Sequence, residues 1–120
     1  MGTEKKLIIL VDDNPANLRI GKNVLSKTYT VATAPSAGKM FTLLENNTPA
    51  LILLDIDMPE MNGYEAITML KSKPETKDIP VIFLTADLQN EEKGRSLGAV
   101  GYITKPFVPS QLLACIEENC

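Results

Sequence analysis

Four short apolar runs recur along the chain, and a polar residue with reactive chemistry follows each of them. The runs are Leu7–Val11, Leu51–Leu54, Val81–Leu84 and Tyr102–Thr104. The residues that follow them are, in the same order, the pair Asp12 and Asp13, then Asp55, Thr85 and Lys105. Short continuous apolar runs are typical of strands that are buried on both faces, as in a parallel sheet. Ligand-binding and reactive residues in open parallel sheets lie at the carboxyl ends of the strands. We therefore expect these polar residues to lie together at one edge of the sheet.

Segments with helical character alternate with these runs. Helices are predicted from about Pro15 to Ser26, from Ser36 to the break at Asn46–Pro49, from Tyr64 to Lys71, from Gln89 to Leu97, and from Pro109 onward. Asn14 and Ser36 are good N-caps, and proline suits the first helical position. The weaker run Thr30–Ala34 fits a strand near a sheet edge. Five strand–helix units predict a doubly wound α/β sandwich of three layers.

Length, composition and charge are those of one domain, which we place at residues 1–120. The 120 residues are 44% hydrophobic and 22% charged, which is enough to bury a core. The net charge of -3 argues against nucleic-acid binding by this domain, because phosphate binding needs a basic patch. No apolar stretch approaches the roughly 20 residues of a membrane span, and we expect no signal peptide, because the first predicted strand begins almost at the first residue. We therefore expect a cytoplasmic location and no contact with membranes.

The cysteine and histidine content narrows the chemistry further. Cys115 and Cys120 are expected to be free thiols in a reducing compartment, because a disulfide between them would close only a tiny loop. Histidine is absent. The chain therefore has no histidine for catalysis or metal binding, and any phosphohistidine must belong to a partner.

The acidic residues at the predicted edge indicate a metal site. Two like unit charges about 4 Å apart repel each other by roughly 4 kcal/mol near a protein surface. We therefore expect a cation to neutralise the carboxylates of Asp12, Asp13 and Asp55. Hard oxygen ligands without histidine or cysteine select Mg²⁺ or Mn²⁺. An isolated Asp-Asp pair could instead be a strand-end turn and helix cap, but the matching Asp55 favours the metal. With Thr85 and Lys105 added, the set forms a cradle for a phosphoryl group, and Asp55 is the candidate nucleophile.

This combination of residues resembles the receiver domain of bacterial two-component response regulators, and is similar to single-domain chemotaxis-type regulators. The resemblance covers nearly the whole chain. It rests on Asp12-Asp13, the segment Asp55–Gly63, Thr85-Ala86, and Lys105–Phe107 with Pro109 and Leu112. The resemblance implies a flavodoxin-like fold whose five-stranded parallel sheet has the order 2-1-3-4-5.

The resemblance also implies how the acidic residues act. Asp55 would accept a phosphoryl group from a phosphohistidine on a partner. Asp13 and Asp55 would bind Mg²⁺ directly, and Asp12 would bind it through water. Asp57 would contribute its backbone carbonyl to the metal. The side chains of Asp57 and Asp87 would tune the lifetime of the phosphoryl group.

A further set of residues would form the switch. The resemblance implies that Thr85 hydrogen-bonds the phosphoryl oxygen, that Lys105 pairs with it, and that the Lys105-Pro106 bond is cis. As Thr85 moves, Tyr102 would turn inward and change the face formed by the fourth helix, fifth strand and fifth helix. Gly94 predicts a marginal, easily repositioned fourth helix, because glycine in a helix costs roughly 1 kcal/mol against alanine. An ordinary surface helix is the alternative.

The predicted function is a phosphorylation-dependent signalling switch that is not an enzyme. The expected partners are a sensor histidine kinase or phosphotransfer protein and an output domain or target protein, and dimerisation on phosphorylation remains open. The main alternative is a magnesium-dependent phosphatase of haloacid-dehalogenase type, since Asp55-Ile56-Asp57 is an Asp-x-Asp motif. In those enzymes, however, the acidic pair comes last in the chain. A free-standing regulator, an excised domain (slightly favoured) and an interaction module without phosphorylation are also open.

Overall fold

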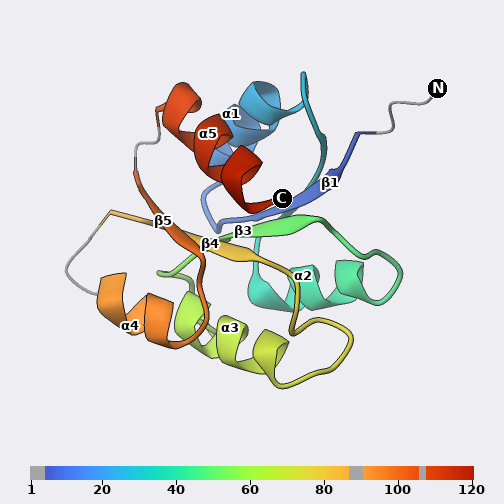
Figure 1. Ribbon diagram of the computed structural model, residues 1–120, viewed down its shortest axis with the longest axis vertical. Helices are drawn as coiled ribbons and strands as arrows, with labels where there is room; N and C mark the ends of the chain where they lie inside the picture. Colours follow the sequence, from blue (N-terminus) through green and yellow to red (C-terminus); the bar gives the residue numbers. More distant parts are fainter. Residues whose placement is uncertain (1–4, 87–90, 106–107) are drawn as a thin grey trace.

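Strands and helices alternate strictly along the chain in the computed structural model, which describes residues 5–86, 91–105 and 108–120 (Figure 1). The elements are β1 Leu7–Val11, α1 Pro15–Leu25, β2 Thr30–Ala34, α2 Ala37–Leu44, β3 Leu51–Asp55, α3 Gly63–Lys71, β4 Val81–Thr85, α4 Glu91–Ser96, β5 Gly101–Thr104 and α5 Pro109–Asn119. All the predicted elements are present, and the described boundaries agree with the prediction or differ from it by one or two residues. The predicted start of the fourth helix at Gln89 lies outside the described residues. No helix in the described ranges is long and apolar enough to cross a membrane.

The sheet is parallel and has the strand order β2-β1-β3-β4-β5, as the resemblance implied. Its register places Val11 opposite Leu54, Asp55 opposite Leu84, and Thr85 opposite Thr104. The central strands β1, β3 and β4 therefore end at nearly the same level. Asp12, Asp55 and Thr85, which follow the last apolar residues of these three strands, therefore lie at the same edge of the sheet.

Helices cover both faces of the sheet. Figure 1 shows α1 and α5 on one face and α2, α3 and α4 on the other. Two separate hydrophobic clusters correspond to these two interfaces. One contains Ile9, Ile52, Phe83, Met40, Ile67 and Leu70. The other contains Ile8, Leu53, Ile82, Leu25, Leu112 and Ile116. Successive strand residues enter opposite clusters, which is why the runs are continuously apolar instead of alternating.

Side-chain caps fix where the helices begin behind the functional edge. The Asn14 side chain accepts a hydrogen bond from the Ala16 N–H at 2.9 Å, so α1 starts directly after the acidic pair. Asn62 and Glu65 form a reciprocal capping box at the start of α3, with bonds of 2.9 and 3.1 Å. The loops after β1 and β3 are thus held at both ends.

The last helix carries both cysteines. Cys115 and Cys120 are free thiols, as the sequence predicted. Cys115 lies at the β5 interface, where burial raises the pKa of its thiol, with the charge of Glu118 as a second cause. Both residues are partly buried, and they contribute to the cluster between the sheet, α1 and α5.

Candidate functional site

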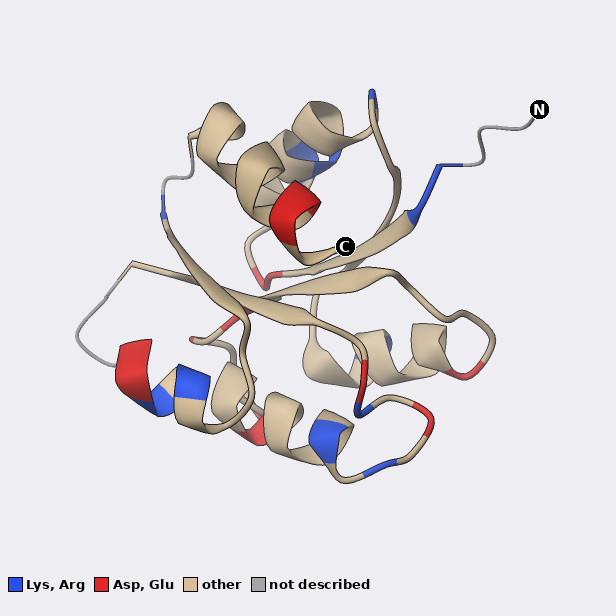
Figure 2. Cartoon of the chain, viewed as in Figure 1, with Lys and Arg blue, Asp and Glu red and all other residues tan. Residues whose placement is uncertain are grey.

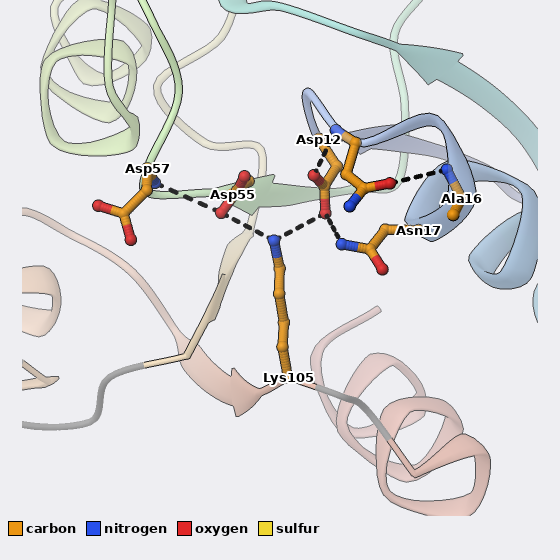
Figure 3. A network of polar contacts seen from close by, with 7 residues as sticks. Asp12, Ala16, Asn17, Asp55, Asp57 and Lys105 are labelled. Carbon is orange, nitrogen blue, oxygen red and sulfur yellow. Dashed lines mark hydrogen bonds and ion pairs between the residues drawn. The ribbon is translucent and has the colours of Figure 1, made fainter.

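The carboxylate of Asp12 is fully buried at the end of β1 and accepts hydrogen bonds on both oxygens (Figure 3). Its Oδ1 accepts the Asn14 N–H at 2.9 Å. Its Oδ2 lies 2.8 Å from the Lys105 Nζ and accepts a longer bond, 3.2 Å, from the Asn17 side-chain amide. A buried charge requires this degree of pairing, because desolvation without partners would be prohibitively costly.

Asp55 ends β3 and is only 3% exposed. Its Oδ1 lies 3.0 Å from the Lys105 Nζ and accepts the Asp57 N–H at 3.3 Å. Burial raises the pKa of Asp55 from 3.8 to about 6, and the neighbouring charge of Asp12 adds to the rise, while Lys105 opposes it. The carboxylate is therefore ionised at neutral pH but held at a cost in free energy.

Lys105 connects the two buried carboxylates. It follows β5, two strands away from Asp55, and its side chain spans that gap, as the strand order predicted. Burial lowers the pKa of Lys105, but the hydrogen bonds and charges of Asp12 and Asp55 outweigh burial and raise it overall. The ammonium group therefore stays charged and acts as the internal counter-ion of the pair.

Three carboxylates meet at this edge. Ligand oxygens of Asp12, Asp13 and Asp55 all lie within 4.8 Å of one another. Figure 2 shows acidic segments after β1 and β3 at the same edge of the sheet as the basic segment after β5. Asp13 is exposed while the other two are buried, so one side of the cluster is open to water. Hard oxygen donors with room for water ligands fit Mg²⁺, and this acidic triad is typical of a Mg²⁺ site.

The remaining predicted site residues lie around this cluster. Thr85 ends β4, is 3% exposed, and accepts the Lys105 N–H on its backbone carbonyl at 2.9 Å. Asp57 is exposed, and Figure 3 shows its carboxylate pointing away from Asp55 and Lys105. Its own N–H is the group that contacts Asp55. Tyr102 is half-buried on β5 and packs edge-on against Phe83, with ring centroids 5.5 Å apart.

Some sequence-based predictions fall on positions that the structure does not describe. These are the cis bond between Lys105 and Pro106, the contribution of Phe107, and the tuning role of Asp87. They remain predictions.

A glycine at the start of α3, whose structural role the sequence analysis did not predict, closes the loop between β3 and α3. The Gly63 N–H donates to the Ile56 carbonyl at 2.8 Å. A Cβ at Gly63 would lie 2.6 Å from the Asp55 backbone oxygen and 2.8 Å from the Ile56 Cα. Only glycine allows this close approach, so Gly63 sets the path of the backbone directly after Asp55. Glu60, within the same loop, adopts a left-handed conformation with φ 69°.

Sequence reasoning also missed Asn17. Its amide reaches back from the first turn of α1 to the Asp12 carboxylate. The available signal was the position of Asn17, a short amide in the first turn of the helix that directly follows Asp12, five residues further along the chain.

Comparison with known proteins supports the interpretation of this geometry. The model of the response regulator receiver domain family matches residues 8–117. A probable cyclic di-GMP phosphodiesterase from Vibrio cholerae is 43% identical over 101 residues, which are 82% of this chain and 23% of that protein. The chain spans about half the length of several transcriptional regulators that it also matches.

Solved structures agree with the fold and with the metal site. The chemotaxis protein CheY4 from Vibrio cholerae has a TM-score of 0.91 at 26% identity, covering 97% of this chain and 99% of that one. The receiver domain of a sensor histidine kinase from Pseudomonas aeruginosa PAO1 has a TM-score of 0.87 at 25% identity, covering 96% and 97%. That structure has a magnesium ion coordinated in its active-site cleft.

These comparisons decide between the functional alternatives. The family match spans nearly the whole chain, and all five chemistry-bearing positions of the sheet edge are present. Receiver domains act with histidine kinases, and they are phosphoacceptors instead of enzymes, so the phosphatase alternative is not supported. The chain belongs to the response regulator receiver domain family and is a phosphorylation-dependent signalling switch.

Proposed function

We propose that Asp55 is the residue that accepts the phosphoryl group from a phosphohistidine of the partner kinase. The observation that carries the proposal is the position of Asp55. It is a buried carboxylate that shares one ammonium group with Asp12, at 3.0 and 2.8 Å, and lies within the acidic triad. With a pKa of about 6, Asp55 is mostly ionised at neutral pH and can act as a nucleophile.

In the transfer step, one carboxylate oxygen of Asp55 forms a bond to phosphorus. The bond between phosphorus and the histidine nitrogen of the partner breaks, and that nitrogen keeps the electron pair. Asp12, Asp13 and Asp55, with the backbone carbonyl of Asp57, would hold Mg²⁺, which when bound neutralises negative charge on the phosphoryl oxygens.

Lys105 has two tasks in this proposal. Before transfer its ammonium group neutralises Asp12 and Asp55. After transfer it pairs with a phosphoryl oxygen, because the new group adds charge and strong acceptors next to its Nζ. Thr85, buried at the end of the adjacent strand, donates its hydroxyl to another phosphoryl oxygen.

Thr85 and Tyr102 transmit the effect of phosphorylation from the site to the surface of the domain. Movement of Thr85 toward the phosphoryl group allows Tyr102 to turn inward, and the surface formed by α4, β5 and α5 changes. We propose that this surface contacts an output domain or target protein, or a second phosphorylated copy. The phosphoryl group shifts the balance between two arrangements that the domain already samples. We place this process in the cytoplasm.

Phosphorylation by a small donor tests the assignment of Asp55. Acetyl phosphate with Mg²⁺ is expected to add one phosphoryl group per chain, detected by intact mass, and to add none to Asp55→Asn. Asp78→Asn, an exposed carboxylate outside the site, is the matched control and should be labelled normally. Labelling of Asp55→Asn at the normal rate would place the acceptor elsewhere.

A further inference from the structure

Gly94 is buried in the middle of α4 and lies against side chains of the sheet. A Cβ built at Gly94 would lie 2.5 Å from the hydroxyl oxygen of Tyr102 and 2.6 Å from its Cε2. It would also lie 2.8 Å from Cδ2 of Phe83. These separations are shorter than real side chains tolerate, so the Tyr102 ring occupies the space that any side chain at position 94 would need.

The Tyr102 ring is also held on its other sides. Tyr64, Phe83 and Tyr102 form an aromatic cluster, in which edge-on contacts join Tyr64 to Phe83 at 5.6 Å and Phe83 to Tyr102 at 5.5 Å. Burial raises the pKa of the Tyr102 hydroxyl, and a side-chain hydrogen bond with Tyr64 raises it further. Lys93 covers the Tyr64 ring, with its Nζ 4.5 Å from the centroid. The half-buried position of Tyr102 is therefore bounded by the side chains of Phe83 and Tyr64 and by the backbone of α4 at Gly94.

We propose that Gly94 is a positioning residue for Tyr102. The absence of a side chain at position 94 makes the half-buried position of the ring available, which we take to be the inward arrangement of the switch, and the residue at this position sets how often Tyr102 occupies it. The link from Gly94 to signalling rests on the proposed function, in which Tyr102 turns inward on phosphorylation. The steric part of the inference does not depend on that function.

This inference is an alternative to the sequence-based interpretation that Gly94 makes α4 marginal and easy to reposition. The two interpretations predict opposite signs for one substitution. If glycine only weakened the helix, Gly94→Ala would stabilise the protein, because alanine is the better helix former. If Gly94 makes room for Tyr102, Gly94→Ala must displace the ring or the helix and lower the urea midpoint of unfolding.

Gly38→Ala provides the matched control. Gly38 lies in α2, and the nearest heavy atom to a Cβ built there is the Ser36 Oγ at 3.8 Å, an ordinary contact. This substitution should leave the urea midpoint unchanged or raise it. Tyr102→Ala provides the rescue, because removing the ring removes two of the three close contacts at Gly94. Gly94→Ala should then lower the midpoint by less than half as much in the Tyr102→Ala background.

The first experiment follows the ring directly, without any phosphodonor. The chain has three tyrosines, so ring-labelled tyrosine gives three NMR signals that Tyr→Phe variants assign. In Gly94→Ala the Tyr102 signal should move toward the shift of free tyrosine, while that of Tyr29 in the opposite cluster stays in place. An unmoved Tyr102 signal, or equal destabilisation with and without the Tyr102 ring, would overturn the role of Gly94.

The second experiment tests the link to the site. Beryllofluoride with Mg²⁺ imitates an aspartyl phosphate, and its binding can be titrated by the same NMR signals. Loss of the inward position should weaken beryllofluoride binding by about fivefold in Gly94→Ala and not in Gly38→Ala. A displaced ring with unchanged beryllofluoride affinity would refute Tyr102 as the switch while supporting the positioning role of Gly94. The two failures are thus distinguishable.

Discussion

The ammonium group of Lys105, after β5, lies 3.0 Å from a carboxylate oxygen of Asp55, at the end of β3, across the width of the intervening strand β4. The same nitrogen lies 2.8 Å from Asp12. One cation thus neutralises two buried acids. A divalent ion that enters the site must share these two carboxylates with the Lys105 ammonium group or displace that group. A phosphoryl group that enters the site must share the ammonium group with the two carboxylates or take it from them.

Asp55→Asn is expected to stabilise the domain at neutral pH when divalent cations are removed. The folded-state pKa of Asp55, about 6, lies above its ordinary value of 3.8, so the folded protein binds this proton more tightly. The resulting stabilisation is complete below pH 3.8 and is lost as the pH rises through about 6. The ionised Asp55 therefore costs free energy at pH 7, on the order of 3 kcal/mol, which asparagine does not incur.

Urea unfolding in EDTA between pH 4 and pH 8 measures this difference. The gap between Asp55→Asn and the unmodified chain should grow with pH. A gap that shrinks as pH rises would mean that the pairing with Lys105 outweighs burial.

Lys105→Ala should leave two buried carboxylates without their counter-ion and destabilise the domain by about 3 kcal/mol without metal. Mg²⁺ should still bind, because the acidic triad is intact, and it should stabilise this variant more than the unmodified chain. Urea midpoints with and without Mg²⁺ test both statements. Lys27→Ala, at an exposed position, is the control. Loss of all Mg²⁺ affinity in Lys105→Ala would contradict the assigned role.

Asn17→Ala should lower Mg²⁺ affinity by about tenfold, because the Asn17 amide orients the carboxylate of Asp12. Asn23→Ala, exposed on the same helix, should bind Mg²⁺ normally and separates this effect from any change in helix stability. Isothermal titration with MgCl₂ gives the affinities. Equal affinities for the two variants would show that the Asn14 N–H and Lys105 are sufficient to orient Asp12.

Gly63→Ala should destabilise the domain by about 2 kcal/mol or more, because its Cβ would lie 2.6 Å from the Asp55 carbonyl oxygen. The backbone must shift to relieve this contact, and that shift moves Asp55. Phosphorylation by acetyl phosphate should therefore slow in those molecules that remain folded. Gly38→Ala again controls for the substitution itself. A fully active, equally stable Gly63→Ala would show that the loop after β3 relaxes without affecting the site.

The sequence predicted which residues lie at the edge of the sheet, because each strand can be located from a short segment of sequence. Apolar runs locate the strands, and parallel strands bring their final residues together, so Asp12, Asp55, Thr85 and Lys105 could be placed without coordinates. The unequal exposure of Asp12 and Asp13 did not follow, since adjacent residues after a strand face different surroundings that only packing determines.

Asn17 and Gly94 show where sequence reasoning ended. The contact of Asn17 depends on how α1 leaves the sheet, and that of Gly94 depends on how closely α4 approaches β5. Glycine in a helix has a known propensity cost, which suggested a weak helix. The packed ring of Tyr102 supplies a different reason, and no local pattern in the sequence carries that information.

The shared ammonium of Lys105 also has a consequence for a cell short of magnesium. Because the counter-ion is built into the chain, Asp12 and Asp55 keep a neutralising partner when the metal is scarce. An arriving ion then meets ligands already in place. Shedding of its tightly held hydration water, which magnesium gives up reluctantly, should limit the speed of loading more than any rearrangement of the polypeptide.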